Sequence, residues 1–195
     1  MKGYPSYPSS RAYLKQVAAL LDELPDQCDR LVETLYRGFE QGRTVFLAGN
    51  GGSAANASHF GQDLAKGTLS SMAATRRFRV IPLTDNIGYI TALANDEGYD
   101  SVFEQQLRNL ASAGDLLVAI SGSGNSPNVL RAVEYARSIG MTTIGVTGFD
   151  GGKLRAMADV GVHIPIEDMG MTEALHAVVF HAAMCFLRER LAKNA

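Results

Sequence analysis

The sequence predicts an α/β protein in which helices cover both faces of a parallel sheet. Five short apolar runs alternate with segments of helical periodicity, which is typical of strand–helix–strand units. The runs are almost continuously apolar, as in Leu116–Ile120, and this indicates strands that are buried on both faces. Two of the runs lead into turns rich in Gly and Ser, at the strand ends where open parallel sheets bind ligands.

Length and composition place this fold in one domain. The 195 residues suit a single domain, 1–195, and the 46% hydrophobic content provides for a sizeable core. A net charge of −2 argues against a nucleic-acid partner. The N-terminus lacks the apolar segment of a signal peptide and no apolar run is of membrane-spanning length, so we expect a cytoplasmic protein without a membrane partner. The two cysteines, Cys28 and Cys185, form no metal or redox motif.

Residues 11–40 have helical periodicity. Apolar residues recur at helical spacing from Leu14 to Leu24, Pro25 interrupts the pattern, and a second helix continues to Phe39. A last long helix is predicted over 172–193. Together these helices carry more apolar surface than a small sheet needs. They either pack on their own domain or, as we favour, form an interface between subunits.

The predicted strands follow this helical segment in order. They are expected at Thr44–Ala48, Phe78–Leu83, Asp115–Ile120, Thr142–Val146 and Val160–Ile164. The first runs directly into the turn Gly49–Ser53, and a helix follows. Backbone N–H groups at such a turn, together with the dipole of the next helix, favour an anion. On that helix His59 and Asp63 are four residues apart and share a face.

The second turn, Ser121–Ser126, follows the third strand. Pro127 comes next, at a position that suits the first turn of a helix. Several hydroxyls and free backbone N–H groups suit a phosphate monoester, although an ordinary turn with a Ser cap has a similar composition. Two such turns at strand ends favour a phosphorylated small molecule. Neither G-x-G-x-x-G nor the Walker pattern is present, so a nucleotide is not indicated.

Histidines and carboxylates form two pairs along the predicted helices. His59 pairs with Asp63, and Glu173 lies three residues before His176 on the last helix, which also carries His181. A single pair of this kind is commonly a surface ion pair. Two pairs, one of them beside a phosphate-like turn, favour a metal or acid–base site. The fourth histidine, His163, lies in a predicted strand and is expected to face solvent.

Five motifs resemble those of the sugar isomerase (SIS) domain family, and within it the phosphoheptose isomerases. The matching segments are Gly49–Phe60 (GNGGSxxxxxHF), Asn95–Gly98, Ser121–Ser126, Thr147–Gly152 and the final E-x-x-H-x-x-x-x-H at Glu173, His176 and His181. The resemblance extends from the N-terminal helices to His181. It implies a flavodoxin-like sheet, a homotetramer bundled through residues 11–40, and a site built from more than one subunit. The family converts sedoheptulose 7-phosphate to a heptose 7-phosphate, a step toward bacterial surface heptose.

Carried over by position, the resemblance assigns roles to particular residues. The substrate-binding residues it implies are Asn50, Gly51, Gly52, Ser53, Asn95, Asp96, Ser121, Ser123, Ser126 and Glu173, with the phosphate on the three serines of the second turn. The Zn²⁺ ligands it implies are His59, Asp63, Glu173 and His181. Asp63 is the expected base and His181 the expected acid of an isomerisation through an enediol.

The chain departs from the family at two of these positions. It has Asp63 where Glu is usual and Glu173 where Gln is usual. Glu173 and His181 are also eight residues apart, ~12 Å along a straight helix, so one metal accepts both only if the helix begins after Glu173 or its side chain leans far along the axis. Otherwise His176 replaces one of them, or different subunits contribute. The alternatives for the function are an isomerase or epimerase of another sugar phosphate, and a non-catalytic phosphosugar-binding or replication-regulating SIS protein.

Overall fold

The strands form one parallel sheet in the order β2-β1-β3-β4-β5. The computed structural model describes residues 5–193, and the ends of the predicted 1–195 domain lie outside them. The strands are β1 (Thr44–Gly49), β2 (Arg79–Pro82), β3 (Leu116–Ser121), β4 (Thr142–Thr147) and β5 (Val160–His163). All five lie within two residues of the predicted runs, so the predicted α/β fold with a five-stranded parallel sheet is confirmed.

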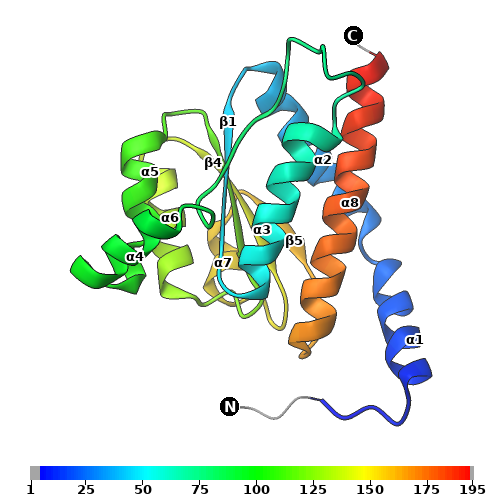
Figure 1. The fold of residues 1–195 in the computed structure, drawn as a ribbon. Helices are drawn as coiled ribbons and strands as arrows, with labels where there is room; N and C mark the ends of the chain where they lie inside the picture. The colour runs from blue at the N-terminus through cyan, green and yellow to red at the C-terminus, as the bar shows by residue number, and fades with distance from the viewer. Residues whose placement is uncertain (1–4, 194–195) are drawn as a thin grey trace.

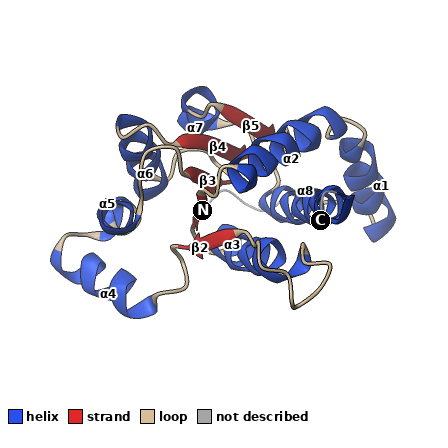
Figure 2. Cartoon of the chain, turned by 90° about the horizontal axis from the view of Figure 1, so that it is seen from above, coloured by secondary structure: helices blue, strands red, loops and turns tan. Residues whose placement is uncertain are grey.

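Helices cover both faces of this sheet, as the view from above shows (Figure 2). One face packs against α2 (Pro25–Glu40), α3 (Gly52–Gln62) and α8 (Met169–Lys193). The other packs against α4 (Ile87–Asp96), α5 (Glu104–Leu110), α6 (Pro127–Ser138) and α7 (Gly152–Met157). Alternate residues of β1 serve the two cores: Val45 and Leu47 belong to the first, and Phe46 and Ala48 to the second. Both cores therefore fix the carboxyl end of β1.

The N-terminal helices differ in how they pack. In α2 one side is buried, including Leu31 and Leu35. Helix α1 (Ser10–Leu21) has no buried residue and lies beside α8 at the outer side of the molecule (Figure 1). It begins where Ser9 accepts a hydrogen bond from the Ala12 N–H at 3.2 Å. Its apolar stripe is thus only partly covered in a single chain: Val17 and Leu20 pack against the core, whereas Leu14 is exposed.

Helix α8 begins at Met169, three residues before its predicted start. The carboxylate of Asp168 accepts a hydrogen bond from the Met171 N–H at 2.9 Å and so caps the first turn. By length and composition alone α8 could cross a membrane. It is instead a core helix here, because Leu175, Val179 and Leu187 lie in the core between α8, α2 and the sheet.

The strand order reverses at β1, which has β2 on one side and β3 on the other. Chain connections leave the carboxyl ends of β1 and β3 in opposite directions, which opens a crevice between them. Both Gly-rich turns follow these two ends.

Candidate functional site

The two turns line a hollow of about 240 Å³ at the carboxyl ends of β1 and β3. Asn50, Gly51, Gly52 and Ser53 form one side, and Ser121, Ser123 and Ser126 form the other. Met169 and Glu173, in the first turns of α8, close it. The structure thus brings together eight of the ten predicted substrate-binding residues around one space.

The serine turn is held by contacts within the chain. The Ser121 and Ser126 hydroxyls lie 3.0 Å apart, and the Gly124 N–H donates to the Ser121 carbonyl at 2.9 Å. Gly124 has φ +65° and packs so closely on the Gly151 carbonyl that a Cβ could not fit. Ser123 is exposed, while Ser121 is buried. The turn therefore has a fixed backbone and presents hydroxyls and amides without any lysine.

The other two predicted substrate residues, Asn95 and Asp96, do not line this hollow. Both are exposed at the end of α4, where the Asn95 amide donates to the Asp96 carboxylate at 2.7 Å. Tyr99, in the following 3₁₀ turn, reaches the first loop, because its hydroxyl donates to Asn50 Oδ1 at 2.9 Å. Within one chain this region contacts the first turn through Tyr99 and not through the predicted pair.

A second group lies further along α3 and α8. His59, Asp63 and His181 offer ligand atoms that all lie within 4.8 Å of one another. Asp63 Oδ2 is 3.2 Å from His181 Nδ1 and 3.8 Å from His59 Nε2. The two imidazoles are about half exposed, at 52% and 50%, whereas the Asp63 side chain is only 10% exposed. The chain thus holds one nearly buried carboxylate between two accessible rings.

Aromatic packing positions these side chains. Phe60 and Phe180, each adjacent in sequence to a histidine of the group, stack with ring centroids 4.3 Å apart and planes 10° from parallel. Both rings are nearly fully buried. Asp63 opens a π-helical turn, Asp63–Gly67, that continues α3, and such turns are frequent at functional sites. The stacked pair fixes α3 against α8 and thereby sets the distance between His59 and His181.

These residues suit a divalent metal ion. Two imidazole nitrogens and a carboxylate oxygen are ligands that Zn²⁺ accepts, and three protein ligands with an open position are typical of catalytic zinc. The rings' exposure leaves room for further ligands. The chemistry of this donor set, rather than any one distance, makes the group a candidate metal centre.

Glu173 does not join this group within one chain. It lies inside α8, two helical turns before His181, and its carboxyl packs on Gly52 so closely that a Cβ there would overlap it. Burial raises the pKa of the Glu173 carboxyl above its ordinary value. Because α8 begins before Glu173, this predicted ligand faces the hollow, and within residues 5–193 the candidate metal group has three members, His59, Asp63 and His181.

The remaining histidines have structural surroundings. His176 is fully buried, and its Nε2 lies 3.1 Å from the Thr147 carbonyl oxygen at the end of β4. Burial lowers the pKa of His176 to about 4, so the ring is neutral near pH 7. His163, expected to face solvent, is partly buried, and its Nδ1 lies 3.0 Å from the Thr147 hydroxyl. Neither ring belongs to the candidate metal group.

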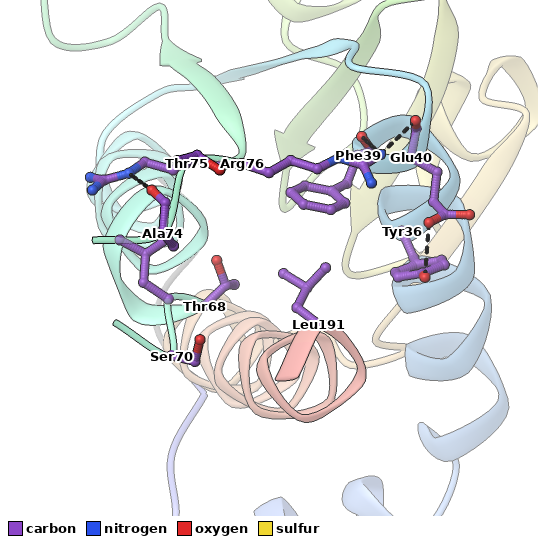
Figure 3. Close-up of a pocket in the computed structure, with 11 residues that line it drawn as sticks. Tyr36, Phe39, Glu40, Thr68, Ser70, Ala74, Thr75, Arg76 and Leu191 are labelled. Atoms are coloured by element: carbon purple, nitrogen blue, oxygen red, sulfur yellow. Dashed lines mark hydrogen bonds between the residues drawn. The ribbon is translucent and has the colours of Figure 1, made fainter. Parts of the chain in front are cut away.

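A separate hollow of about 280 Å³ lies between α2, the end of α8 and the segment 68–77 (Figure 3). It contains none of the predicted site residues. Arg76 lies 4.6 Å from the centre of the Phe39 ring and donates to the carbonyls of Phe39 and Glu40. The guanidinium thus ties the segment to α2 at the edge of this hollow.

Comparisons with known proteins agree with the geometry. The model of the SIS domain family matches residues 11–148. The phosphoheptose isomerase of Aliarcobacter butzleri is 37% identical over 174 residues, which cover 89% of this chain and 90% of that protein. The solved phosphoheptose isomerase of Neisseria gonorrhoeae superposes with a TM-score of 0.83 at 32% identity, covering 92% of this chain and 96% of that one. That of Francisella tularensis gives a TM-score of 0.85 at 27% identity, with the same coverage.

Proposed function

The chain belongs to the SIS-domain family of phosphoheptose isomerases, and from this premise we propose that it interconverts sedoheptulose 7-phosphate and D-glycero-D-manno-heptose 7-phosphate. The observation that carries the proposal is the pairing of two features on the same helices. A hollow suited to phosphate lies at the first turns of α3 and α8, and a carboxylate between two imidazoles lies further along both. A phosphosugar isomerase needs an anion anchor and acid–base groups at separate points of one site.

The serine turn supplies the anchor in this proposal. Ser121, Ser123 and Ser126 donate hydroxyl hydrogens to the phosphate, and the amides of the turn add to them. Binding energy from this end of the substrate holds the reacting carbons in place without taking part in the chemistry. Gly51 and Gly52, which carry no side chain, let the sugar approach the backbone of the first turn.

Proton transfer falls to the second group. Asp63 removes the proton from the carbon next to the ketose carbonyl, and His181 protonates the carbonyl oxygen, which gives an enediol. The reverse transfers at the neighbouring carbon and oxygen give the aldose, so that no proton or electron is gained or lost overall. The nearly buried Asp63 carboxylate and the accessible His181 ring suit these two tasks.

We propose that His59, Asp63 and His181 would hold Zn²⁺ through one atom each, which leaves the second carboxylate oxygen of Asp63 and the second ring nitrogen of His181 for proton transfer. Glu173 is assigned to the substrate. Bound Zn²⁺ would supply a Lewis acid that polarises the carbonyl oxygen. His59, which takes part in neither proton transfer, would then hold the ion beside Asp63. Glu173, whose carboxyl faces the hollow, accepts hydrogen bonds from sugar hydroxyls.

We further propose that the chain is one SIS domain and that it is cytoplasmic. Four copies assemble into a homotetramer through residues 11–40 and α8. Leu14 is 63% exposed on α1, and Val178 and Phe186 are 45% and 54% exposed on α8, which lies beside it. In such an assembly Asn95 and Asp96, remote from the hollow of their own chain, would contribute to a site shared between subunits. Native mass spectrometry tests the stoichiometry, and a stable monomer at micromolar concentration would refute it.

The reaction is tested by NMR of the purified protein with sedoheptulose 7-phosphate, with and without added Zn²⁺. We expect anomeric signals of an aldose product, formed faster with the metal. No product from an intact oligomer would refute the heptose assignment.

A second substrate remains a candidate because of two substitutions. Asp63 has a shorter side chain than the usual Glu, and Glu173 places a carboxylate where an amide is usual. Both alter the reach and charge of the site. A panel of ketose and aldose phosphates, scored by turnover and by thermal stabilisation, separates an isomerase of another sugar from the heptose enzyme and from a protein that binds without turnover.

A further inference from the structure

Asn128 is a buried amide behind the candidate site that the proposed reaction does not use. It is the second residue of α6, directly after the serine turn, and is 1% exposed. Its side chain forms a reciprocal pair with that of Asn50: Asn128 Nδ2 donates to Asn50 Oδ1 and Asn50 Nδ2 donates to Asn128 Oδ1, each at 2.9 Å. The pair crosses the crevice between the ends of β1 and β3.

Further hydrogen bonds fix the pair at both ends. Asn128 Oδ1 also accepts from the Val129 N–H at 3.0 Å, which ties the amide to the first turn of α6. Asn50 Oδ1 also accepts from the Tyr99 hydroxyl at 2.9 Å. A carbonyl oxygen has two lone pairs, and here both are taken by Asn128 and Tyr99. The Asn50 amide can therefore take only one orientation without leaving a donor unpaired.

This orientation decides what Asn50 offers to a substrate. Of its two Nδ2 hydrogens, one is donated to Asn128, and within residues 5–193 no hydrogen bond engages the other. Its oxygen is fully used. Asn50 thus faces the hollow as a hydrogen-bond donor, suited to a carbonyl or hydroxyl oxygen of the sugar rather than to a hydroxyl hydrogen.

We propose that Asn128 is a positioning residue that fixes the Asn50 amide as a donor toward the sugar and holds the first turn in register with the serine turn. The proposal deepens the proposed function and rests on Asn50 contacting the sugar. Strand pairing aside, the hydrogen bonds described for residues 5–193 include no other between 50–53 and 121–128. Asn128 acts through Asn50 and does not touch the substrate.

The test compares Asn128→Ala with Asn50→Ala and with the double variant. Alanine is used because Asp at 128 would place a negative charge beside the phosphate. For sedoheptulose 7-phosphate we expect Asn128→Ala to lower kcat/KM about tenfold, the scale of losing one or two oriented hydrogen bonds. Because Asn128 acts through Asn50, the double variant should be no worse than Asn50→Ala alone. Additive losses would overturn the proposal.

A second readout separates positioning from simple loss of structure. The inhibition constant of inorganic phosphate reports the serine turn alone, and we expect Asn128→Ala to leave it within twofold. A collapsed turn would raise it together with KM, and that result would overturn the proposal. Asn109→Ala, which truncates an exposed asparagine on α5, is the matched control and should leave all constants unchanged.

Tyr99→Phe keeps the proposal testable if Asn128→Ala does not fold. Tyr99 is 53% exposed, so the loss of its hydroxyl should not affect folding. The Tyr99→Phe substitution frees one lone pair of Asn50 Oδ1, while Asn128 still donates to the other. We expect kcat/KM to fall about threefold and the inhibition constant of inorganic phosphate to stay unchanged. No change would overturn the argument that both lone pairs fix Asn50. If the wild type shows no turnover, the proposed function fails, and dissociation constants for the sugar phosphate and for phosphate then provide the same comparison.

Discussion

The hollow and the candidate metal group are built in different ways, although α3 and α8 pass through both. The hollow is made mostly of backbone turns at the ends of two buried strands, and hydrogen bonds within the chain fix its shape. The metal group consists of three side chains on helix surfaces, and two of them are half exposed. In the proposed function, binding of phosphate therefore needs little rearrangement, whereas the candidate metal group depends on how firmly α3 and α8 are packed.

The largest effect on turnover is expected from a change to Asp63, the carboxylate of the candidate metal group. Asp63→Asn keeps the size of the side chain but removes its basicity, and it should lower turnover about 10³-fold, within the range of general acid–base catalysis. Inhibition by inorganic phosphate should not change, because the serine turn is untouched. Turnover is measured by NMR, and circular dichroism checks the fold. A folded variant with full turnover would remove Asp63 from the mechanism.

The packing beneath the metal group gives the next effect. Phe180→Ala removes a stacked, buried ring and should lower the free energy of unfolding by about 3 kcal/mol. It should also weaken the stabilisation by Zn²⁺, because His59 and His181 are no longer held together. Urea denaturation with and without Zn²⁺ measures both effects.

Ile87→Ala is the control for Phe180→Ala, since it truncates a side chain that is 73% exposed at the start of α4. It should change stability by less than about 0.5 kcal/mol. If Phe180→Ala lost stability but kept the full Zn²⁺ effect, the metal group would not depend on helix packing, and the comparison between the two regions would fail.

His176, which lies on α8 three residues after Glu173, gives a pH-dependent effect. Its folded pKa of about 4 lies below the ordinary value of 6.5, so between these values the unfolded chain binds more protons and stability falls as pH falls. The slope from this group approaches about 1.4 kcal/mol per pH unit, or about 3 kcal/mol over the window. The partly buried His163, whose pKa is also lowered, acts in the same direction.

His176→Gln isolates this contribution. Glutamine can still donate to the Thr147 carbonyl but does not titrate, so the variant should lose less stability than the wild type between pH 6.5 and pH 4.5. Urea midpoints at several pH values and one fixed protein concentration measure the difference. Parallel pH profiles for the two proteins would show that His176 is not buried as a neutral ring.

Much of this architecture could be predicted from the sequence, because it follows from local patterns. Period and composition located all five strands, and the two Gly- and Ser-rich turns indicated the hollow. The family pattern placed both Glu173 and His181 on one metal, and their eight-residue spacing allowed this only if the helix began after Glu173 or the Glu173 side chain leaned far along the axis; α8 begins before it, at Met169, and the group of ligand atoms includes His181 but not Glu173. The sequence predicts the start of α8 three residues too late, because Asp168 caps a first turn that precedes the predicted helical run.

The sequence does not reveal residues that act only through tertiary contacts. Asn128 follows an ordinary helix-starting proline, and nothing in its neighbourhood indicates a pair with Asn50, 78 residues away. Tyr99 reaches the same amide from a 3₁₀ turn with no motif of its own. Asn95 and Asp96 match a family motif, yet the single chain leaves them exposed and away from the hollow, because a motif carries no information about where its residues lie in the fold.

The smallest effect is expected in the hollow, at the serine turn. Ser123 is the exposed serine of the preformed turn, and its hydroxyl makes one long contact within the chain, accepting from the Asn125 N–H at 3.3 Å. Ser123→Ala should therefore leave the turn intact and raise KM about five- to tenfold, the scale of losing one hydrogen bond of about 1 kcal/mol, with kcat little changed. Ser138→Ala, at the far end of α6, is the matched control. Since the turn binds phosphate before and after the chemistry alike, the inhibition constant of inorganic phosphate should rise by the same factor as KM. A fall in kcat instead would mean that Ser123 contacts the reacting end of the sugar, and the two regions would then have to be regarded as one.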